Sequence, residues 1–130
     1  MRSGNAVVLF GHGARDPEWA GPMRRTAQAM RAQSPELLVE LAFLEFMQPT
    51  LVEAIDSVVA AGARRITVVP MFLAQGGHLK RDVPLLVEQA SLRHPGCEIR
   101  QALAVGEADR VVTAMAEYAL EQGRLPSTSK

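Results

Sequence analysis

The sequence lacks the features that mark secreted, membrane-bound and nucleic-acid-binding proteins. It contains one cysteine, Cys97, among 130 residues, so it cannot form an internal disulfide, and we expect a reducing compartment. It has no apolar run long enough to cross a bilayer and no signal-peptide core near the N-terminus. Fourteen basic residues balance fourteen acidic ones, so the net charge favours neither a nucleic acid nor a membrane as a partner. These absences predict a cytoplasmic protein.

What the chain does contain is a regular alternation of strand and helix patterns. Hydrophobic residues make up 48% of the sequence and charged residues 22%, which is an ordinary balance for a globular domain. Short apolar segments typical of buried strands lie at residues 6–10, 37–44, 65–70 and 97–104. We therefore predict a three-layer α/β domain over residues 1–122, with a four-stranded parallel sheet between helices, followed by a flexible tail at 123–130.

Capping residues and apolar stripes define the expected helices. Asp16-Pro17 and Pro49-Thr50 are typical helix starts, and Gly62 is a typical residue after a helix end. The first helix should place Trp19 on its buried stripe, and the third should begin near Val83, after a glycine-rich loop. A last helix is indicated by an apolar stripe at Val111, Val112, Met115 and Ala119, and the histidine at position 94 is assigned to a surface turn.

Three chemically capable side chains follow three of the expected strands. His12 lies between two glycines after the first strand, Glu45 follows the second, and His78 lies in the loop after the third. In a parallel sheet, ligands gather at the carboxyl ends of the strands, so we expect these side chains at one edge. Glycines beside His12 would leave its ring open to a ligand. Two imidazoles and a carboxylate suit a first-row divalent ion with exchangeable positions.

Other interpretations of these residues remain open. A single histidine beside glycine is more often a packing residue than a ligand, and a glutamate after a strand is often only solvated. A histidine phosphatase is a weak alternative, because Gly11 stands where that class needs an arginine before the histidine. A non-catalytic carrier of a metal or a tetrapyrrole would need the same ligands as an enzyme.

Four stretches of the chain together carry a family resemblance. "LFGHGARDPEW", "LAFLEFMQPTLVEAID", "GARRITVVPMFLAQGGHLKRDVP" and "IRQALAVGEAD" resemble the small sirohydrochlorin cobaltochelatases, which are class II chelatases related to ferrochelatase. The likeness extends from about residue 7 to about residue 120. It implies insertion of a divalent metal into sirohydrochlorin for cobalamin or sirohaem, with cobalt foremost and nickel or ferrous iron as alternatives. No ATP is expected, because the chain has no G-x-x-x-x-G-K-[ST] motif, and no cofactor beyond the substrate metal.

The resemblance also implies roles for individual residues. His12 and His78 would bind the incoming metal, His12 would also accept a pyrrole proton, and Glu45 would contact the substrate and remove protons. The tetrapyrrole would lie against a single stretch made of Leu73, Ala74, Gln75, Gly76, Gly77 and His78. From charge and proximity, Arg15, Lys80 and Arg81 are expected to pair with substrate carboxylates.

Larger class II chelatases hold the tetrapyrrole between two such domains in one chain. This sequence predicts one domain, and a single sheet edge would leave a wide planar ligand half in water. The resemblance therefore implies a homodimer.

Overall fold

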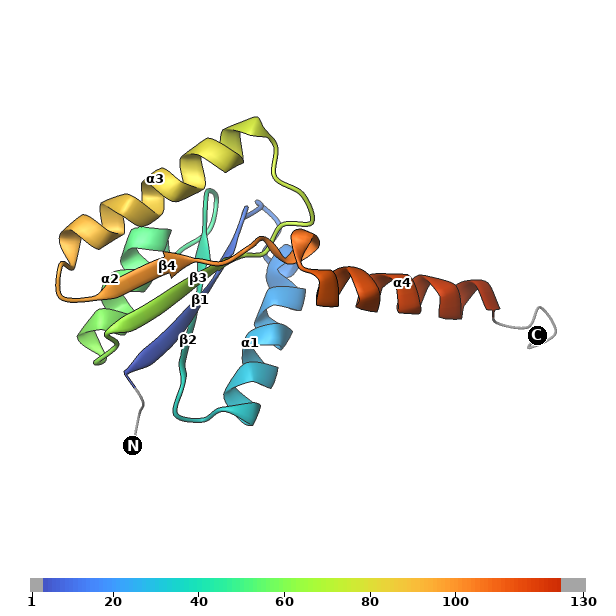
Figure 1. Cartoon of the computed structure of the whole chain (residues 1–130), viewed down its shortest axis with the longest axis horizontal. Coiled ribbons are helices and arrows are strands. Elements are labelled where there is room, and N and C mark those ends of the chain that lie inside the picture. Colours follow the sequence, from blue (N-terminus) through green and yellow to red (C-terminus); the bar gives the residue numbers. More distant parts are fainter. Residues whose placement is uncertain (1–3, 125–130) are drawn as a thin grey trace.

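A parallel sheet of four strands forms the centre of the protein, as the sequence predicts (Figure 1). The computed structural model describes residues 4–124. The elements in chain order are β1 (Asn5–Gly11), the 3₁₀ turn η1 (Pro17–Ala20), α1 (Gly21–Gln33), β2 (Leu38–Phe43), α2 (Leu51–Ala60), β3 (Arg65–Pro70), α3 (Gly77–Arg93), β4 (Glu98–Gln101), the 3₁₀ turn η2 (Val105–Glu107) and α4 (Asp109–Arg124).

The order of the strands across the sheet is β2-β1-β3-β4, and every pairing is parallel. From β1 the chain first moves to one neighbour, β2, and then crosses back to the other neighbour, β3. The direction of winding therefore reverses between β1 and β3. In open parallel sheets, the crevice outside the carboxyl ends of the two strands at such a reversal is the usual place for a ligand.

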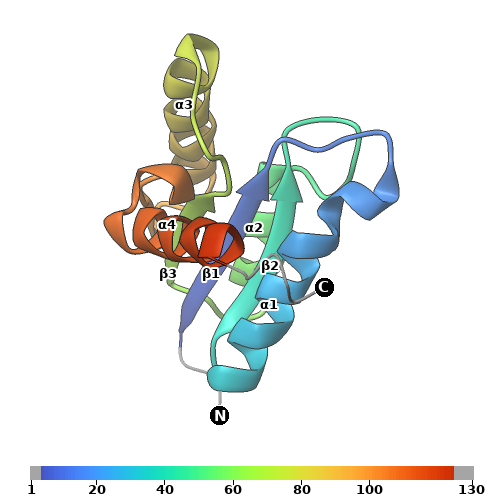
Figure 2. The ribbon, with the colours of Figure 1, turned by 90° about the vertical axis from the view of Figure 1, so that its right-hand side faces the viewer.

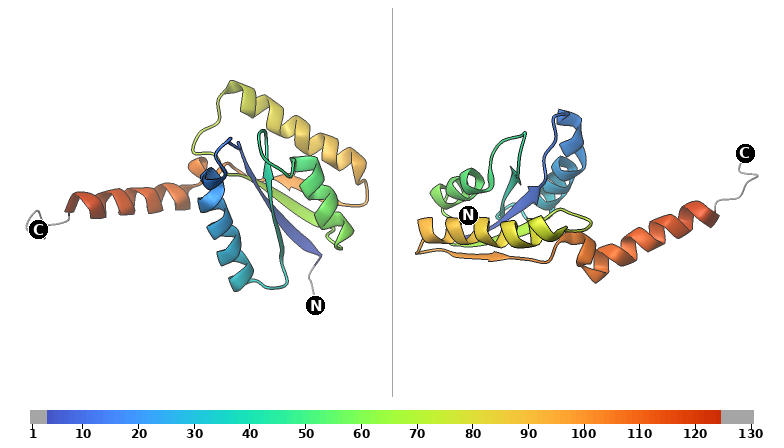
Figure 3. Two further views of the ribbon diagram at one scale, coloured as in Figure 1. Left: turned by 180° about the vertical axis from the view of Figure 1, so that it is seen from behind. Right: turned by 90° about the horizontal axis from the view of Figure 1, so that it is seen from above.

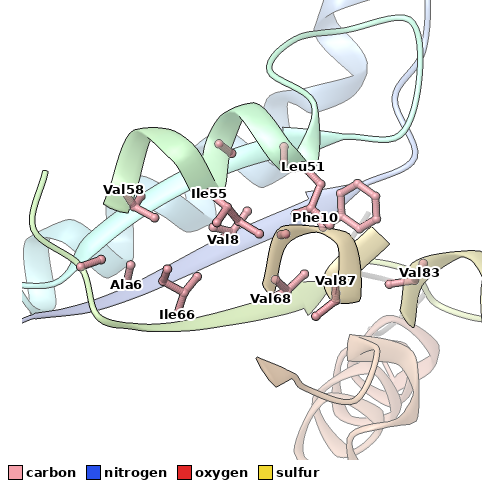
Figure 4. Close-up of a cluster of buried hydrophobic side chains, with 14 of the residues drawn as sticks. Ala6, Val8, Phe10, Leu51, Ile55, Val58, Ile66, Val68, Val83 and Val87 are labelled. Carbon is pink, nitrogen blue, oxygen red and sulfur yellow. The ribbon is translucent and has the colours of Figure 1, made fainter. Parts of the chain in front are cut away.

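Helices cover the two faces of the sheet unequally. On one face, α2 packs over β1 and β2, and α3 packs against α2 and β4. These helices enclose the main apolar cluster, which includes Phe10, Ile55, Val68 and Val83 (Figure 4). On the other face, α1 alone packs, chiefly over β1 and β2, and encloses a smaller cluster around Leu9 and Met23 (Figure 2). Both faces are thus apolar, but only one of them is covered by two helices.

The residues that were predicted to mark helix ends form the expected capping interactions. The Asp16 carboxylate accepts a hydrogen bond from the backbone N–H of Glu18. Thr50 and Glu53 form a reciprocal capping box at the start of α2, because each side chain accepts from the other residue's backbone N–H. Gly62 follows the end of α2 with φ of 110°, a conformation that glycine adopts without steric cost. The boundaries of this helix were therefore readable from sequence.

Three predicted boundaries are wrong. The first helix does not run continuously from Asp16, because Pro22 has no N–H to continue it; η1 is followed by a new helix, and Trp19 is 41% exposed, with its ring edge against Phe43. The third helix begins at Gly77 rather than near Val83. Leu79 in its first turn continues the apolar stripe and packs against the core, but the glycines at positions 76 and 77 favoured a loop there. The fourth strand ends at Gln101 because the chain then turns into η2.

The last helix does not pack on the sheet, in contrast to α1, α2 and α3. It projects away from the domain on the side that carries α1 (Figures 1 and 3). It continues to Arg124, so residues 123 and 124 of the expected tail are helical; the remainder of that tail lies outside the described residues. Within residues 4–124, no helix is both long and apolar enough to span a membrane.

A polar cluster joins α2 to the end of α3. The guanidinium Nη2 of Arg93 lies 2.6 Å from Oδ2 of Asp56, and Nε2 of His94 lies 2.6 Å from Oδ1 of the same carboxylate. His94 lies in the expected turn after α3, where its carbonyl accepts a hydrogen bond from the Cys97 N–H at 2.9 Å, and its side chain is 19% exposed. The hydrogen bond from Arg93, followed in strength by that from His94, holds the pKa of Asp56 below its ordinary value.

We expect this cluster to make stability depend on acid pH. A lowered carboxyl pKa means that the stabilisation is complete above the unfolded-state pKa, about 4, and is lost as pH falls through the lower folded-state value. At pH 7, Asp56→Asn should therefore have a lower melting temperature than wild type. The loss in the free energy of unfolding should be about 1 kcal/mol or less, because the cluster is partly exposed. The difference should shrink below pH 4 in thermal melts followed by circular dichroism.

Glu98→Gln is the matched control for this measurement. Its partner, Arg65, lies 3.7 Å away, and both side chains are more than two-thirds exposed, so this variant should melt like wild type at every pH. An Asp56→Asn variant with the same acid profile as wild type would contradict the expectation.

Candidate active site at the carboxyl edge of the sheet

The crevice outside β1 and β3 is bordered by three loops. These loops follow β1, β2 and β3, and α3 begins at the same end of the sheet (Figure 1). His12 comes directly after β1, Glu45 lies two residues after β2, and residues 71–76 connect β3 to α3. The three loops therefore lie at the carboxyl edge of the sheet, which is the edge that the sequence predicted.

His12 and Glu45 form a direct side-chain pair. Nε2 of His12 lies 2.9 Å from Oε2 of Glu45, and the two side chains are 46% and 48% exposed. The backbone holds them together, because the N–H of Leu44 donates to the Gly11 carbonyl at 2.9 Å and that of Glu45 donates to the His12 carbonyl at 3.0 Å. The ladder thus closes at Gly11 and Phe43, and one further bond between the two loops places an imidazole beside a carboxylate where solvent and ligands can reach both.

The glycines around His12 serve close packing more than they serve access to the ring. Gly13 has φ of 94°, and a Cβ there would lie 1.9 Å from the Glu45 carbonyl oxygen. A Cβ at Gly11 would lie 2.5 Å from Sδ of Met23. The expectation that these residues keep the imidazole open is therefore incomplete: Gly13 allows the two loops to touch, and Gly11 allows α1 to approach β1.

The loop after β3 forms the opposite side of the crevice. Phe72 is buried, and its ring makes edge contacts with the rings of Phe10 and His12, whose centroids lie 6.1 and 6.4 Å away. The adjacent Leu73 is 69% exposed. Nε2 of Gln75 is a buried donor with no hydrogen-bond partner in the described structure. This loop therefore offers an exposed apolar side chain and an unsatisfied amide, next to the two small glycines at positions 76 and 77.

The second predicted metal ligand is positioned by a helix, not by the expected loop. His78 is the second residue of α3, and Lys80 and Arg81 follow in the same first turns. All three are exposed. Within residues 4–124, no group of three or more histidine, cysteine or acidic side chains converges on one point. The structure thus joins His12 to Glu45 and leaves His78 as a separate donor on the far side of the crevice.

An aromatic residue that sequence reasoning missed lies beside this pair. Phe46 follows Glu45, has φ of 68° and is 55% exposed. Positive φ is costly for a bulky residue, and such strain concentrates at functional sites. The Arg15 guanidinium carbon lies 4.5 Å from the centroid of the Phe46 ring, a cation–π contact. Its position directly after the candidate carboxylate Glu45 could have drawn attention to Phe46. A phenylalanine near a strand end is usually part of the core, so it was not selected.

The donor set limits the chemistry that this edge can perform. An imidazole and a carboxylate, with a second imidazole across the crevice, suit first-row divalent ions, and they leave coordination positions open. The pair can also accept and pass a proton. The edge therefore places groups that are capable of metal binding and proton transfer beside exposed apolar and aromatic surface.

Solved structures that superpose on this chain include a CbiX protein and a sirohydrochlorin chelatase. A CbiX protein of cobalamin biosynthesis from Marinobacter aquaeolei superposes with a TM-score of 0.79 at 29% identity, over 91% of this chain and 96% of that one. The sirohydrochlorin chelatase SirB from Bacillus subtilis, solved in complex with cobalt, gives a TM-score of 0.75 at 27% identity, over 93% of this chain and 51% of that one. The fold is thus that of the class II chelatases.

Sequence comparisons narrow this class to one family. Residues 6–122 match the sequence profile of the family named CbiX. The sirohydrochlorin cobaltochelatase of Saccharolobus solfataricus is 38% identical over 102 residues, which cover 75% of this chain and 78% of that protein. The enzyme of the same name from Methanococcus aeolicus is 39% identical over 82 residues, which cover 63% of this chain and only 57% of that protein. The chain belongs to the CbiX family.

The contact between Gly13 and Glu45 should be indispensable to the geometry of the pair. Gly13→Ala combines an unfavourable positive φ with a clash against backbone, so we expect a loss of more than about 1 kcal/mol in the free energy of unfolding. Thermal or urea unfolding measures it. Gly96→Ala is the control, because a Cβ there meets no atom within 4 Å. Equal stability of the two variants would show that the loops do not need this close approach.

Proposed function

We propose that this protein is a sirohydrochlorin chelatase that inserts a divalent metal, cobalt foremost, into its tetrapyrrole substrate without ATP. The observation that carries the proposal is the half-exposed His12–Glu45 pair at the reversal point of the sheet in a chain of the CbiX family. The relatives named above bear the name of this activity. We also place the enzyme in the cytoplasm, because its one cysteine fits a reducing compartment.

The reaction exchanges one metal ion for two protons. A divalent ion enters the ring, two pyrrole N–H bonds break, and two protons leave, so charge is conserved. His12 and His78 bind the arriving ion. Nε2 of His12 cannot hold both a metal and the hydrogen bond to Glu45, so metal binding at this nitrogen releases the carboxylate. Glu45 is then free to accept a pyrrole proton and pass it to solvent, to which it is half exposed.

The walls of the crevice supply contacts for a planar, multiply charged ligand. The loop from Leu73 to Gly77 lines one side of the ring, and the Gln75 amide donates to a substrate acceptor. Lys80 and Arg81 lie in the first turns of α3, where the helix dipole adds partial positive charge. With Arg15 across the crevice, they bind substrate carboxylates.

The proposed enzyme is a homodimer. One sheet edge covers one side of a tetrapyrrole, and small-molecule sites bury most of the ligand surface. This chain matches about half of SirB, so a second copy would supply the missing half.

Loss of either metal-binding imidazole should abolish most of the activity. His12→Ala and His78→Ala should fold normally, because both side chains are exposed, and turnover with cobalt should fall at least about tenfold. The assay follows the absorbance change of sirohydrochlorin on metal insertion. His94→Ala is the control, since His94 bonds Asp56 away from the crevice, and it should keep wild-type turnover below its melting temperature. Near-wild-type turnover by either site variant would remove that residue from the mechanism.

Replacing the carboxylate should separate proton removal from binding. Glu45→Gln keeps the size of the side chain and a hydrogen bond to His12 but cannot act as a base. We expect turnover to fall by about 10²-fold while sirohydrochlorin still binds, as measured by titration of its absorbance. Lost binding with unchanged turnover per bound substrate would make Glu45 a positioning residue.

Repeating the assay on the wild-type protein with cobalt, nickel and ferrous iron identifies the preferred metal. Binding of sirohydrochlorin without any turnover would indicate a carrier.

A further inference from the structure

The loop after β2 is anchored on both sides of Phe46. Leu44 packs against the main apolar cluster and Met47 against the smaller one, so these two residues hold the loop to opposite faces of the sheet. The backbone N–H of Phe43 donates to the Pro49 carbonyl at 2.9 Å and closes the loop at its base. Between these anchors, Phe46 is 55% exposed. The loop therefore fixes the position at which this phenylalanine stands in solvent.

The backbone at Phe46 has a conformation that does not suit phenylalanine. Its φ of 68° lies in the left-handed region, which glycine and asparagine adopt more readily than a bulky residue does. A small or polar residue at this position would lower the backbone strain and would also be better solvated. Strained residues persist where the surrounding structure imposes them, and they concentrate at active sites and ligand-binding sites. The fold by itself therefore gives little reason for an aromatic side chain here.

A cation lies against one side of this ring. The Arg15 guanidinium carbon is 4.5 Å from the ring centroid, and this contact connects the loop after β1 to the loop after β2 at the carboxyl edge of the sheet (Figure 2). Arg15 is exposed, and within residues 4–124 it forms no ion pair with a carboxylate, so its charge is available to a ligand. Glu45 precedes Phe46 and pairs with His12. Apolar and positively charged groups thus meet directly beside the proposed base.

We propose that Phe46 is a substrate-binding residue whose ring packs on the apolar face of the tetrapyrrole, while Arg15 binds a carboxylate at the edge of the same ligand. This inference rests on the proposed function and deepens it, because it names a contact that holds the macrocycle in the crevice. The ligand has the two matching features, which are a flat ring system and carboxylates at its periphery. Aromatic side chains attract flat ring systems in offset and edge-to-face arrangements. Phe46 therefore suits this ligand better than it suits solvent.

The place of Phe46 in the chain decides what this contact does. Glu45, the proposed base, is the preceding residue, and its N–H donates to the His12 carbonyl at 3.0 Å. A macrocycle that packs on Phe46 is therefore held close to the carboxylate that accepts its protons and to the imidazole that delivers the metal. A phenylalanine side chain has no group that transfers a proton or binds a metal. Its contact therefore stabilises the bound substrate and the transition state to the same extent.

Removal of the ring should weaken substrate binding without slowing the bound substrate. Phe46→Leu keeps an apolar side chain but loses the flat ring, so we expect the Kd of sirohydrochlorin, measured by titration of its absorbance, to rise about threefold to tenfold. KM should rise by a similar factor, while kcat stays within about twofold of wild type, because the contact is equal in both states. Phe46→Tyr retains the ring and should restore wild-type affinity.

Leu92→Ala is the control for these measurements. Leu92 is a 75% exposed apolar residue near the end of α3, at the opposite end of this helix from the crevice, so the variant should bind sirohydrochlorin like wild type. Phe46→Asn is a second test variant, because asparagine tolerates a positive φ and therefore keeps the loop while it removes the ring. Thermal melts establish that each variant is folded, and Phe46→Asn should show at least the loss of affinity of Phe46→Leu.

The outcomes separate this inference from the proposed function. Wild-type affinity in the folded Phe46 variants, or a lower kcat at unchanged KM, overturns the substrate contact alone. A change in the sedimenting mass of these variants would make Phe46 a contact between copies, which also overturns it. A wild-type protein that does not bind sirohydrochlorin contradicts the proposed function and this inference together. If the wild type binds without turnover, the enzyme proposal fails, and the Kd values still decide whether Phe46 contacts the tetrapyrrole.

Discussion

The loops that follow β1 and β2 are joined by their backbones, and the candidate site at this edge of the sheet depends on that contact. The Leu44 N–H donates to the Gly11 carbonyl and closes the ladder, and the Glu45 N–H donates to the His12 carbonyl between the loops. A Cβ at position 13 would break this approach. Because the backbones are joined, the imidazole and the carboxylate meet without help from other side chains. The pairing of these two side chains is thus a consequence of the backbone contacts between the two loops.

The surroundings of this pair differ on its two sides. Toward β3, the His12 ring contacts the buried Phe72, which packs in turn on Phe10 in the core. Toward the loop after β2, the strained Phe46 stands exposed with Arg15 over its ring. One aromatic residue therefore fixes the orientation of the imidazole, while the other offers an open apolar face with a positive charge. These surroundings combine apolar surface, a positive charge and access of water, which are the features that the proposed planar, carboxylate-bearing substrate requires.

Part of one sheet face and the last helix are not covered by other elements of the chain. Two βα units place helices on one face of the sheet and one unit places a helix on the other, but the fourth unit leaves α4 in solvent and part of the sheet bare. The core of the domain is closed, but α4 does not pack on it. This helix follows η2, which is hydrogen-bonded to the loop that borders the crevice.

Sequence alone determined the parts of this protein that depend on neighbouring residues in the chain. Apolar runs located the strands, the capping residue Thr50 located the start of α2, and strand order along the chain placed His12 and Glu45 at one edge. Tertiary structure decided the rest. The first turn of α3 follows two glycines that favoured a loop, although Leu79 continues the apolar stripe of this helix, and Pro22 divided the first helix. The exposure of Phe46 and the direction of α4 depend on which surfaces meet in space, because the same apolar residues could equally have been core, and no local pattern distinguishes a helix that packs on its own sheet from one that leaves it.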